Sequence, residues 1–223
     1  RCRQAHCLHG TFDHRPGTQM HVCAAIVGQQ LQRRLGAQDG ATQVLLPLIT
    51  LAYAPRARSA AVIGQGSGMS SHLLLASPAI QDLVTVEIEP QMVAGSRIFY
   101  PANRRAFEDP RSHLVLDDAK SYFASASRRF DLIMSEPSNP WVSGVASLFT
   151  SEFYQMVSRR LAPRGVFEQW IQLYEINDDL LLGILAAIHA NFRSYVLYQA
   201  SVMDLVVLAS NEPSLPTPDW SIV

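Results

Sequence analysis

The sequence predicts an α/β domain with a mostly parallel sheet of seven strands, helices on both faces and an antiparallel edge. Short apolar runs alternate with helical segments along most of the chain, and this alternation is typical of parallel sheets covered on both sides. The first run, Ala60 to Ile63, ends in closely spaced glycines that open a helix. Strand, glycine turn and helix in that order indicate a nucleotide-binding unit.

The expected strands are apolar runs bounded by turn residues. Only a few residues separate the last two strands, so we expect them to form an antiparallel pair at the edge of the sheet. The runs are Ala60 to Ile63, Leu83 to Ile88, His113 to Leu116, Asp131 to Met134, Gly165 to Ile171, Tyr195 to Tyr198 and Leu205 to Ala209.

Three segments have clear helical character. Ala41 to Tyr53 is apolar but contains Pro47, so we expect an interrupted helix. Ser151 to Leu161 has apolar residues at three- and four-residue spacing, and Thr150 can cap its first turn. Asn177 to Asn191 is rich in Leu, Ile and Ala, which favours a third helix.

The chain divides into three expected parts. Residues 1–40 form an atypical N-terminal segment and linker, in which Val22 to Leu35 has helical potential, residues 41–211 form the main domain, and residues 212–223 form a Pro-rich tail. A first residue that is not Met suggests a domain of a longer product. The three cysteines lie within the first 23 residues without a CxxC pair, so no metal site is predicted.

Composition narrows the classes of partner. A net charge of -1 with scattered Lys and Arg argues against nucleic acid binding. The longest apolar run, Val44 to Ala54, is about half of what a membrane-spanning helix needs, and no secretory signal is recognisable. We therefore expect a cytoplasmic protein with small-molecule ligands.

Polar side chains follow four of the expected strands, where an open parallel sheet binds its ligand. Gly64, Gly66 and Gly68 allow close backbone approach to a nucleotide. Glu87, about 20 residues after the loop, suits ribose hydroxyls, and Asp118 can accept from an adenine amine. A plain tight turn, a solvated strand end and a helix N-cap remain the alternative interpretations of these three features.

The segment from Ser135 to Trp141 is stiffened by two prolines and presents Glu136, Ser138 and Asn139. A purely structural turn is the alternative interpretation here. Together with the GVASLFT that follows, SEPSNPW resembles the spermidine synthases, or polyamine aminopropyltransferases, and especially their spermidine synthase-like branch. The resemblance covers about Gly40 to Pro213. It implies a methyltransferase-like Rossmann fold that binds S-adenosylmethionine or its decarboxylated form, without a metal.

The resemblance also implies roles for individual residues. It assigns Glu87 to the ribose, Asp118 to the adenine and Gln43 to the cofactor or substrate. The full set of implied cofactor contacts is Gln43, Gly64, Gly66, Ser67, Gly68, Glu87, Asp118 and Ala119, and the implied acceptor contacts are Thr42, Ser138 and Trp141.

Three positions depart from the family pattern. Ser67 stands in place of an Asp that holds the aminopropyl amine, Thr42 in place of a diamine-binding Tyr, and Asn139 in place of the catalytic Asp. An amine with an ordinary pKa of about 10.4 must lose a proton before it attacks, and Asn cannot take that proton. Glu136 is therefore our hypothesis for the base or cation anchor.

The function expected from this resemblance is aminopropyl transfer from the S-adenosyl nucleotide to a polyamine acceptor. Two alternatives are an S-adenosylmethionine-dependent methyltransferase and a non-catalytic member of the family. Whether the protein forms a homodimer is left open.

Overall fold

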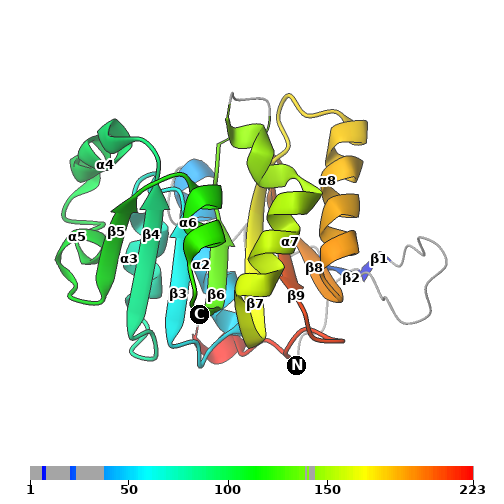
Figure 1. The fold of residues 1–223 in the computed structure, drawn as a ribbon, viewed down its shortest axis with the longest axis horizontal. Coiled ribbons are helices and arrows are strands. Elements are labelled where there is room, and N and C mark those ends of the chain that lie inside the picture. The colour runs from blue at the N-terminus through cyan, green and yellow to red at the C-terminus, as the bar shows by residue number, and fades with distance from the viewer. Residues whose placement is uncertain (1–6, 9–20, 24–37, 139, 141–143, 223) are drawn as a thin grey trace.

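A computed structural model describes residues 7–8, 21–23, 38–138, 140 and 144–222. Within them one nine-stranded sheet has the order β1-β2-β8-β9-β7-β6-β3-β4-β5 (Figure 1). The fold is of the α/β class, as the alternation of strands and helices predicts.

Five neighbouring strands form the parallel part of the sheet. They are β5 (Ser112–Leu116), β4 (Asp82–Glu87), β3 (Ser59–Ile63), β6 (Phe130–Ser135) and β7 (Leu161–Gln172), and every pair between them is parallel. From β3 the chain adds β4 and β5 on one side of that strand and then crosses over to add β6 and β7 on its other side. In open sheets such a switch point places the ligand crevice at the carboxyl ends of the strands.

The other end of the sheet is antiparallel. Strand β9 (Asp204–Ser210) pairs antiparallel with both β7 and β8 (Ser194–Ser201), so the expected seven-stranded arrangement is confirmed. Two short strands extend it, because β2 (His21–Cys23) pairs parallel with β8 and antiparallel with β1 (Cys7–Leu8). The prediction of a helix from Val22 to Leu35 is wrong at its start, because Val22 and Cys23 belong to β2. The other residues of that segment lie outside the described part of the chain.

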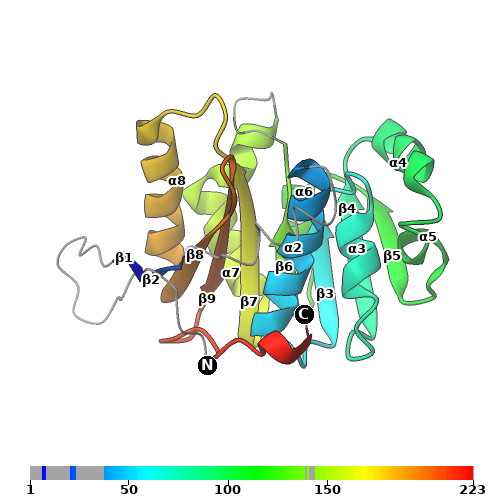
Figure 2. The same ribbon diagram turned by 180° about the vertical axis from the view of Figure 1, so that it is seen from behind.

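Helices cover both faces of the sheet. One face carries α6 (Ala119–Ser125), α7 (Ser151–Arg160) and α8 (Asp178–Asn191), and the opposite face carries α2 (Gln38–Tyr53) and α3 (Met69–Leu74) (Figures 1 and 2). Further short helices are α4 (Pro90–Ser96), η1 (Arg97–Phe99), α5 (Arg105–Glu108), η2 (Val145–Phe149) and η3 (Trp220–Ile222).

The helix boundaries follow local hydrogen bonding. The Thr150 hydroxyl accepts from the Phe153 backbone N–H at 3.3 Å, so the predicted cap of α7 is present. Helix α2 continues through Pro47, which corrects the expected interruption. Proline removes only one backbone donor, whereas burial of Leu45 and Ile49 on either side of it holds the helix against the sheet.

The C-terminal tail packs against α2. The Asp219 backbone N–H donates to the Ala52 carbonyl oxygen at 2.8 Å, and the Trp220 ring meets the rings of Tyr53 and Tyr198 edge to face. The division of the chain at residues 40 and 211 stays a prediction.

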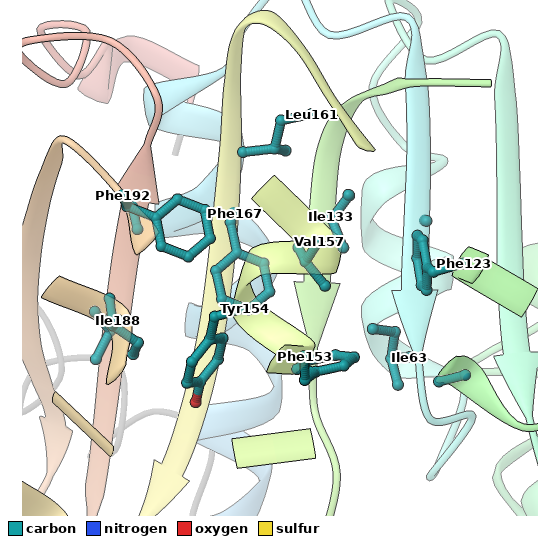
Figure 3. Close-up of a cluster of buried hydrophobic side chains, with 14 of the residues drawn as sticks. Ile63, Phe123, Ile133, Phe153, Tyr154, Val157, Leu161, Phe167, Ile188 and Phe192 are labelled. Carbon is teal, nitrogen blue, oxygen red and sulfur yellow. The ribbon is translucent and has the colours of Figure 1, made fainter. Parts of the chain in front are cut away.

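Aromatic side chains dominate the core under α7 and α8. Phe167 from β7 stacks on Phe192 with 5.2 Å between ring centroids, and the ring of Tyr154 meets both (Figure 3). Phe153 and Val157 extend the cluster toward β6. No helix among the described residues is both long and apolar enough to cross a membrane.

The stacked pair gives the first testable prediction. Phe167→Ala removes a ring with no exposed surface and should lower the free energy of unfolding by about 3–5 kcal/mol, measured by urea denaturation. Leu182→Ala, at a position that is 53% exposed on α8, is the control and should change it by less than about 0.5 kcal/mol. Equal losses in the two variants would contradict this description of the core.

Candidate functional site

The loop after β3 has a backbone that only glycine adopts easily. Gly64, Gly66 and Gly68 have φ values of 94°, 46° and 76°, in the left-handed region that disfavours side chains. A Cβ at Gly64 would also lie 2.9 Å from the carbonyl oxygen of Glu136. The missing side chain therefore lets the loops after β3 and β6 approach each other.

Glu87, at the end of β4, ties two loops together. Its Oε2 accepts from the Gln65 backbone N–H at 2.7 Å and its Oε1 from the Glu89 backbone N–H at 2.9 Å. The side chain is buried, yet each carboxylate oxygen has a further lone pair that can accept from a ligand. The predicted ribose-binding acid thus lies directly against the glycine loop.

Ser67 and Gln43 are in contact, although 24 residues separate them in the sequence. The Ser67 hydroxyl donates to the Oε1 of the exposed Gln43 at 2.6 Å, which joins α2 to the glycine loop. Asn103 supports this arrangement because its Nδ2 donates to the Ser67 carbonyl oxygen at 2.7 Å and to the Ser96 carbonyl oxygen at 2.8 Å. Sequence reasoning missed Asn103, which lies in an irregular segment.

Glu136 directly follows the last residue of β6, and its side chain contacts α3. Its backbone N–H donates to the Ile63 carbonyl oxygen at 3.0 Å, and its Oε1 accepts from the Ser70 hydroxyl at 2.8 Å. Burial raises the pKa of Glu136 to about 7, while the Ser70 hydrogen bond acts in the opposite direction. A carboxyl group with this pKa can both take and release a proton near neutral pH.

Glu168 is a second buried carboxyl group that the sequence analysis did not single out. It lies in the middle of β7 with no exposed surface, and neither of its oxygens has a hydrogen-bond partner within the described part of the chain. Burial, and secondarily the charge of Glu136, raise its pKa well above the ordinary value. A charged residue inside an apolar strand, as in GVFEQW, is the signal that could have found it.

Asp118 and Ala119 lie at the start of α6, beside the end of β4. The Asp118 side chain accepts from the Ser121 backbone N–H at 2.9 Å, as an N-cap. The preceding residue, Asp117, donates its backbone N–H to the Glu87 carbonyl oxygen at 3.1 Å. Asp118 therefore acts as a cap and still stands beside the predicted ribose site.

The structure describes only some of the residues that the resemblance assigns to binding of the polyamine acceptor. Thr42 is buried and its hydroxyl donates to the Asp204 Oδ2 at 2.7 Å. Ser138 is exposed, whereas Asn139 and Trp141 lie outside the described residues. Among the described residues no group of three His, Cys, Asp or Glu side chains is arranged to hold a metal ion.

These features define a class of protein: a Rossmann-like α/β domain in which a glycine loop follows a central parallel strand and an acid from the next strand lies against it. In such domains the ligand binds at this end of the strands. Among solved structures, the fold is similar to a spermidine synthase in complex with the transition state analogue AdoDATO, with TM-score 0.69, 21% identity and coverage of 77% of this chain and 61% of that one. It is also similar to human methyltransferase-like protein 13 in complex with SAH, with TM-score 0.59, 18% identity and coverage of 85% and 84%.

Sequence comparison identifies the family. The model of the spermine/spermidine synthase domain matches residues 42–206, so the chain belongs to the spermine/spermidine synthase domain family. A polyamine aminopropyltransferase of Nitrosomonas europaea is 31% identical over 145 residues, which is 63% of this chain and 44% of the relative. That of Pectobacterium atrosepticum is 28% identical over 203 residues, 83% of this chain and 70% of the relative. The chain thus spans less than half of the first of these relatives.

The contact between Gly64 and Glu136 gives the second prediction. Gly64→Ala should destabilise the domain by more than Gly66→Ala, because both glycines have positive φ but a Cβ at Gly66 meets no atom within 4 Å. The Gly66 variant should lose about 1–2 kcal/mol from its left-handed backbone, measured by urea denaturation. A smaller loss for Gly64→Ala than for Gly66→Ala would contradict the close approach of the two loops.

Proposed function

We propose that this domain transfers an aminopropyl group from a decarboxylated S-adenosyl nucleotide to a polyamine acceptor. The observation that carries the proposal is the position of Glu136, whose carboxyl lies beside the glycine loop and has a pKa of about 7. Family membership and the polyamine aminopropyltransferases among its relatives support this reaction.

Glu87 and the glycine loop are the proposed nucleoside site. The backbone N–H groups of Gln65 and Glu89 hold both carboxylate oxygens of Glu87 in place, so the acid is oriented before a ligand arrives. A ribose diol would donate to the remaining lone pairs. Gln43, held by Ser67, would face the rest of the nucleotide, and Asp118 the adenine.

The proposed chemical step needs one proton acceptor. The acceptor nitrogen attacks the carbon beside the sulfonium, a C–N bond forms, and the C–S bond breaks with its electron pair going to sulfur, which becomes a neutral thioether. Glu136 takes the proton that the amine gives up. Since a base must be ionised to act, the raised pKa places the onset of activity near neutral pH.

Replacing the base tests this role. Glu136→Gln keeps the shape of the side chain but cannot accept the proton, so transfer should fall at least about 100-fold, measured by mass spectrometry of the product with putrescine as acceptor. Binding of the nucleotide should stay within about threefold by calorimetry. Glu152→Gln, on the exposed start of α7, is the control. Unchanged turnover in the Glu136 variant would rule out the assignment.

The pH dependence provides a separate prediction. The rate of the wild-type domain at limiting acceptor should rise with pH through an apparent pKa of about 7, because Glu136 loses its proton over that interval. A rate that already reaches its plateau near pH 5, about where an ordinary carboxyl is ionised, would contradict the role of Glu136.

Glu87 is tested by ligand binding alone. Glu87→Gln leaves one oxygen for the two backbone donors that the carboxylate now accepts from, so nucleotide affinity should fall by about tenfold or more, or roughly 1.4 kcal/mol. Glu108→Gln, where the carboxylate is exposed and accepts from the Tyr100 hydroxyl, should leave the affinity unchanged. Equal affinities in the Glu87 variant and the wild type would place the nucleoside elsewhere.

A further inference from the structure

Glu168 points to the same face of the sheet as Glu136. In the register of β6 and β7, Glu168 is the partner of Met134, and Glu136 lies two residues beyond Met134. Because side chains two residues apart on an extended strand share a face, both carboxyl groups face the layer of α2 and α3. Figure 2 shows α2 in front of β6, with β7 beside it.

The two carboxyl groups have different surroundings. Glu136 is partly exposed and accepts from the Ser70 hydroxyl, so its ionised form has a hydrogen-bond donor. Glu168 has no exposed surface, and neither oxygen meets the geometry of a hydrogen bond within the described residues. The nearby Ser135 backbone lowers the pKa of Glu168, but burial and the charge of Glu136 raise it by more. An ionised carboxylate without donors is costly to bury, and a second negative charge close by adds to that cost.

Among the residues that the structure describes, none of the other ionisable groups on this face supplies the missing positive charge. The other carboxyl groups on this face among the described residues are Asp204 on β9, which accepts from Thr42, Ser201 and Trp170, and Glu87 on β4, which accepts from two backbone N–H groups. Tyr53 on α2 and Tyr198 on β8, whose hydroxyl groups are 2.6 Å apart, also lie on this face, and a tyrosine side chain is never cationic. In α3, His72 is engaged with Arg105 on α5.

We propose that Glu168 and Glu136 form a carboxyl pair that holds one proton near neutral pH, with Glu168 as its protonated member. Once Glu136 is ionised, above its pKa of about 7, the pair carries a single negative charge, and this charge is on Glu136, which has the Ser70 donor. Glu168 is a positioning residue, because it has no exposed surface and acts through Glu136.

The consequence for the reaction rests on the proposed function. With Glu168 neutral, Glu136 is the carboxylate that meets the cationic acceptor and takes its proton. A pair that holds one charge complements one ammonium group, whereas two ionised carboxylates side by side would repel each other without a cation between them. The ionisation state itself can be measured without any turnover.

The sign of the pH effect on stability follows from linkage. The pKa of Glu168 is raised in the folded protein, so between the ordinary pKa of about 4.5 and the raised one the folded state holds a proton that the unfolded state has lost. Stability therefore falls as pH rises through this interval. Glu168→Gln mimics the neutral acid and removes the fall.

The test is the Tm of Glu168→Gln minus that of the wild type, measured by calorimetry from about pH 5 to about pH 8. The difference should rise with pH by at least about 4 °C. A repacking effect alone would shift Tm equally at every pH, as would the exposed control Glu152→Gln. A difference that is flat, or that falls as pH rises, would overturn the protonated state of Glu168.

A double-mutant cycle tests the pairing. In a Glu136→Gln background, Glu168→Gln should produce a smaller rise with pH, because the neighbouring negative charge is already gone. An equal rise in both backgrounds would mean that Glu168 is buried alone, and would overturn the pair while leaving the proposed reaction intact.

The rate profile separates this inference from the proposed function. If Glu168 is already neutral, Glu168→Gln should leave the rise of the rate with pH, the activity limb, at about pH 7. A shift of that limb downward by about one pH unit or more would show that Glu168 was ionised, which contradicts the proposal. Loss of the limb in Glu136→Gln, tested independently, decides the role of Glu136.

Discussion

The site depends on a backbone contact that only glycine permits. At Gly64 the chain turns with φ of 94° directly against the Glu136 carbonyl oxygen, and the Glu136 backbone N–H pairs with Ile63. This contact brings the loop that would hold a nucleoside next to the carboxyl that would take a proton. Both loops come from neighbouring parallel strands, so the sheet itself sets their relative position.

Three carboxyl groups, on or directly after β4, β6 and β7, acquire different properties from their surroundings. Glu87 is held by two backbone N–H groups, which favours an oriented acceptor. Glu136 has one hydroxyl donor and a pKa of about 7, which favours proton transfer. Glu168 is fully buried and has no well-formed hydrogen bond among the described residues, which favours the neutral acid. The local supply of donors therefore distinguishes the proposed binding group, the proposed base and the proposed proton-holding neighbour.

Local signals predicted the strands, the Thr150 cap and the polar residues that follow each strand, because these depend on neighbours in the sequence. The continuous helix through Pro47 and the strand at Val22 could not be predicted, since tertiary packing and pairing with β8 override local preference. Glu168 was missed because its raised pKa depends first on complete burial in the folded sheet and then on the charge of Glu136, 32 residues away. The roles of Asn139 and Trp141 stay predictions.

The most direct test of the account is a comparison of two nucleotides on the same domain. Calorimetry would measure binding of S-adenosylmethionine and of its decarboxylated form, and mass spectrometry would follow the product after putrescine is added. The account predicts tighter binding of the decarboxylated form and an acceptor that gains an aminopropyl group. Preference for the carboxylated form with a methylated acceptor, or binding without any product, would contradict it.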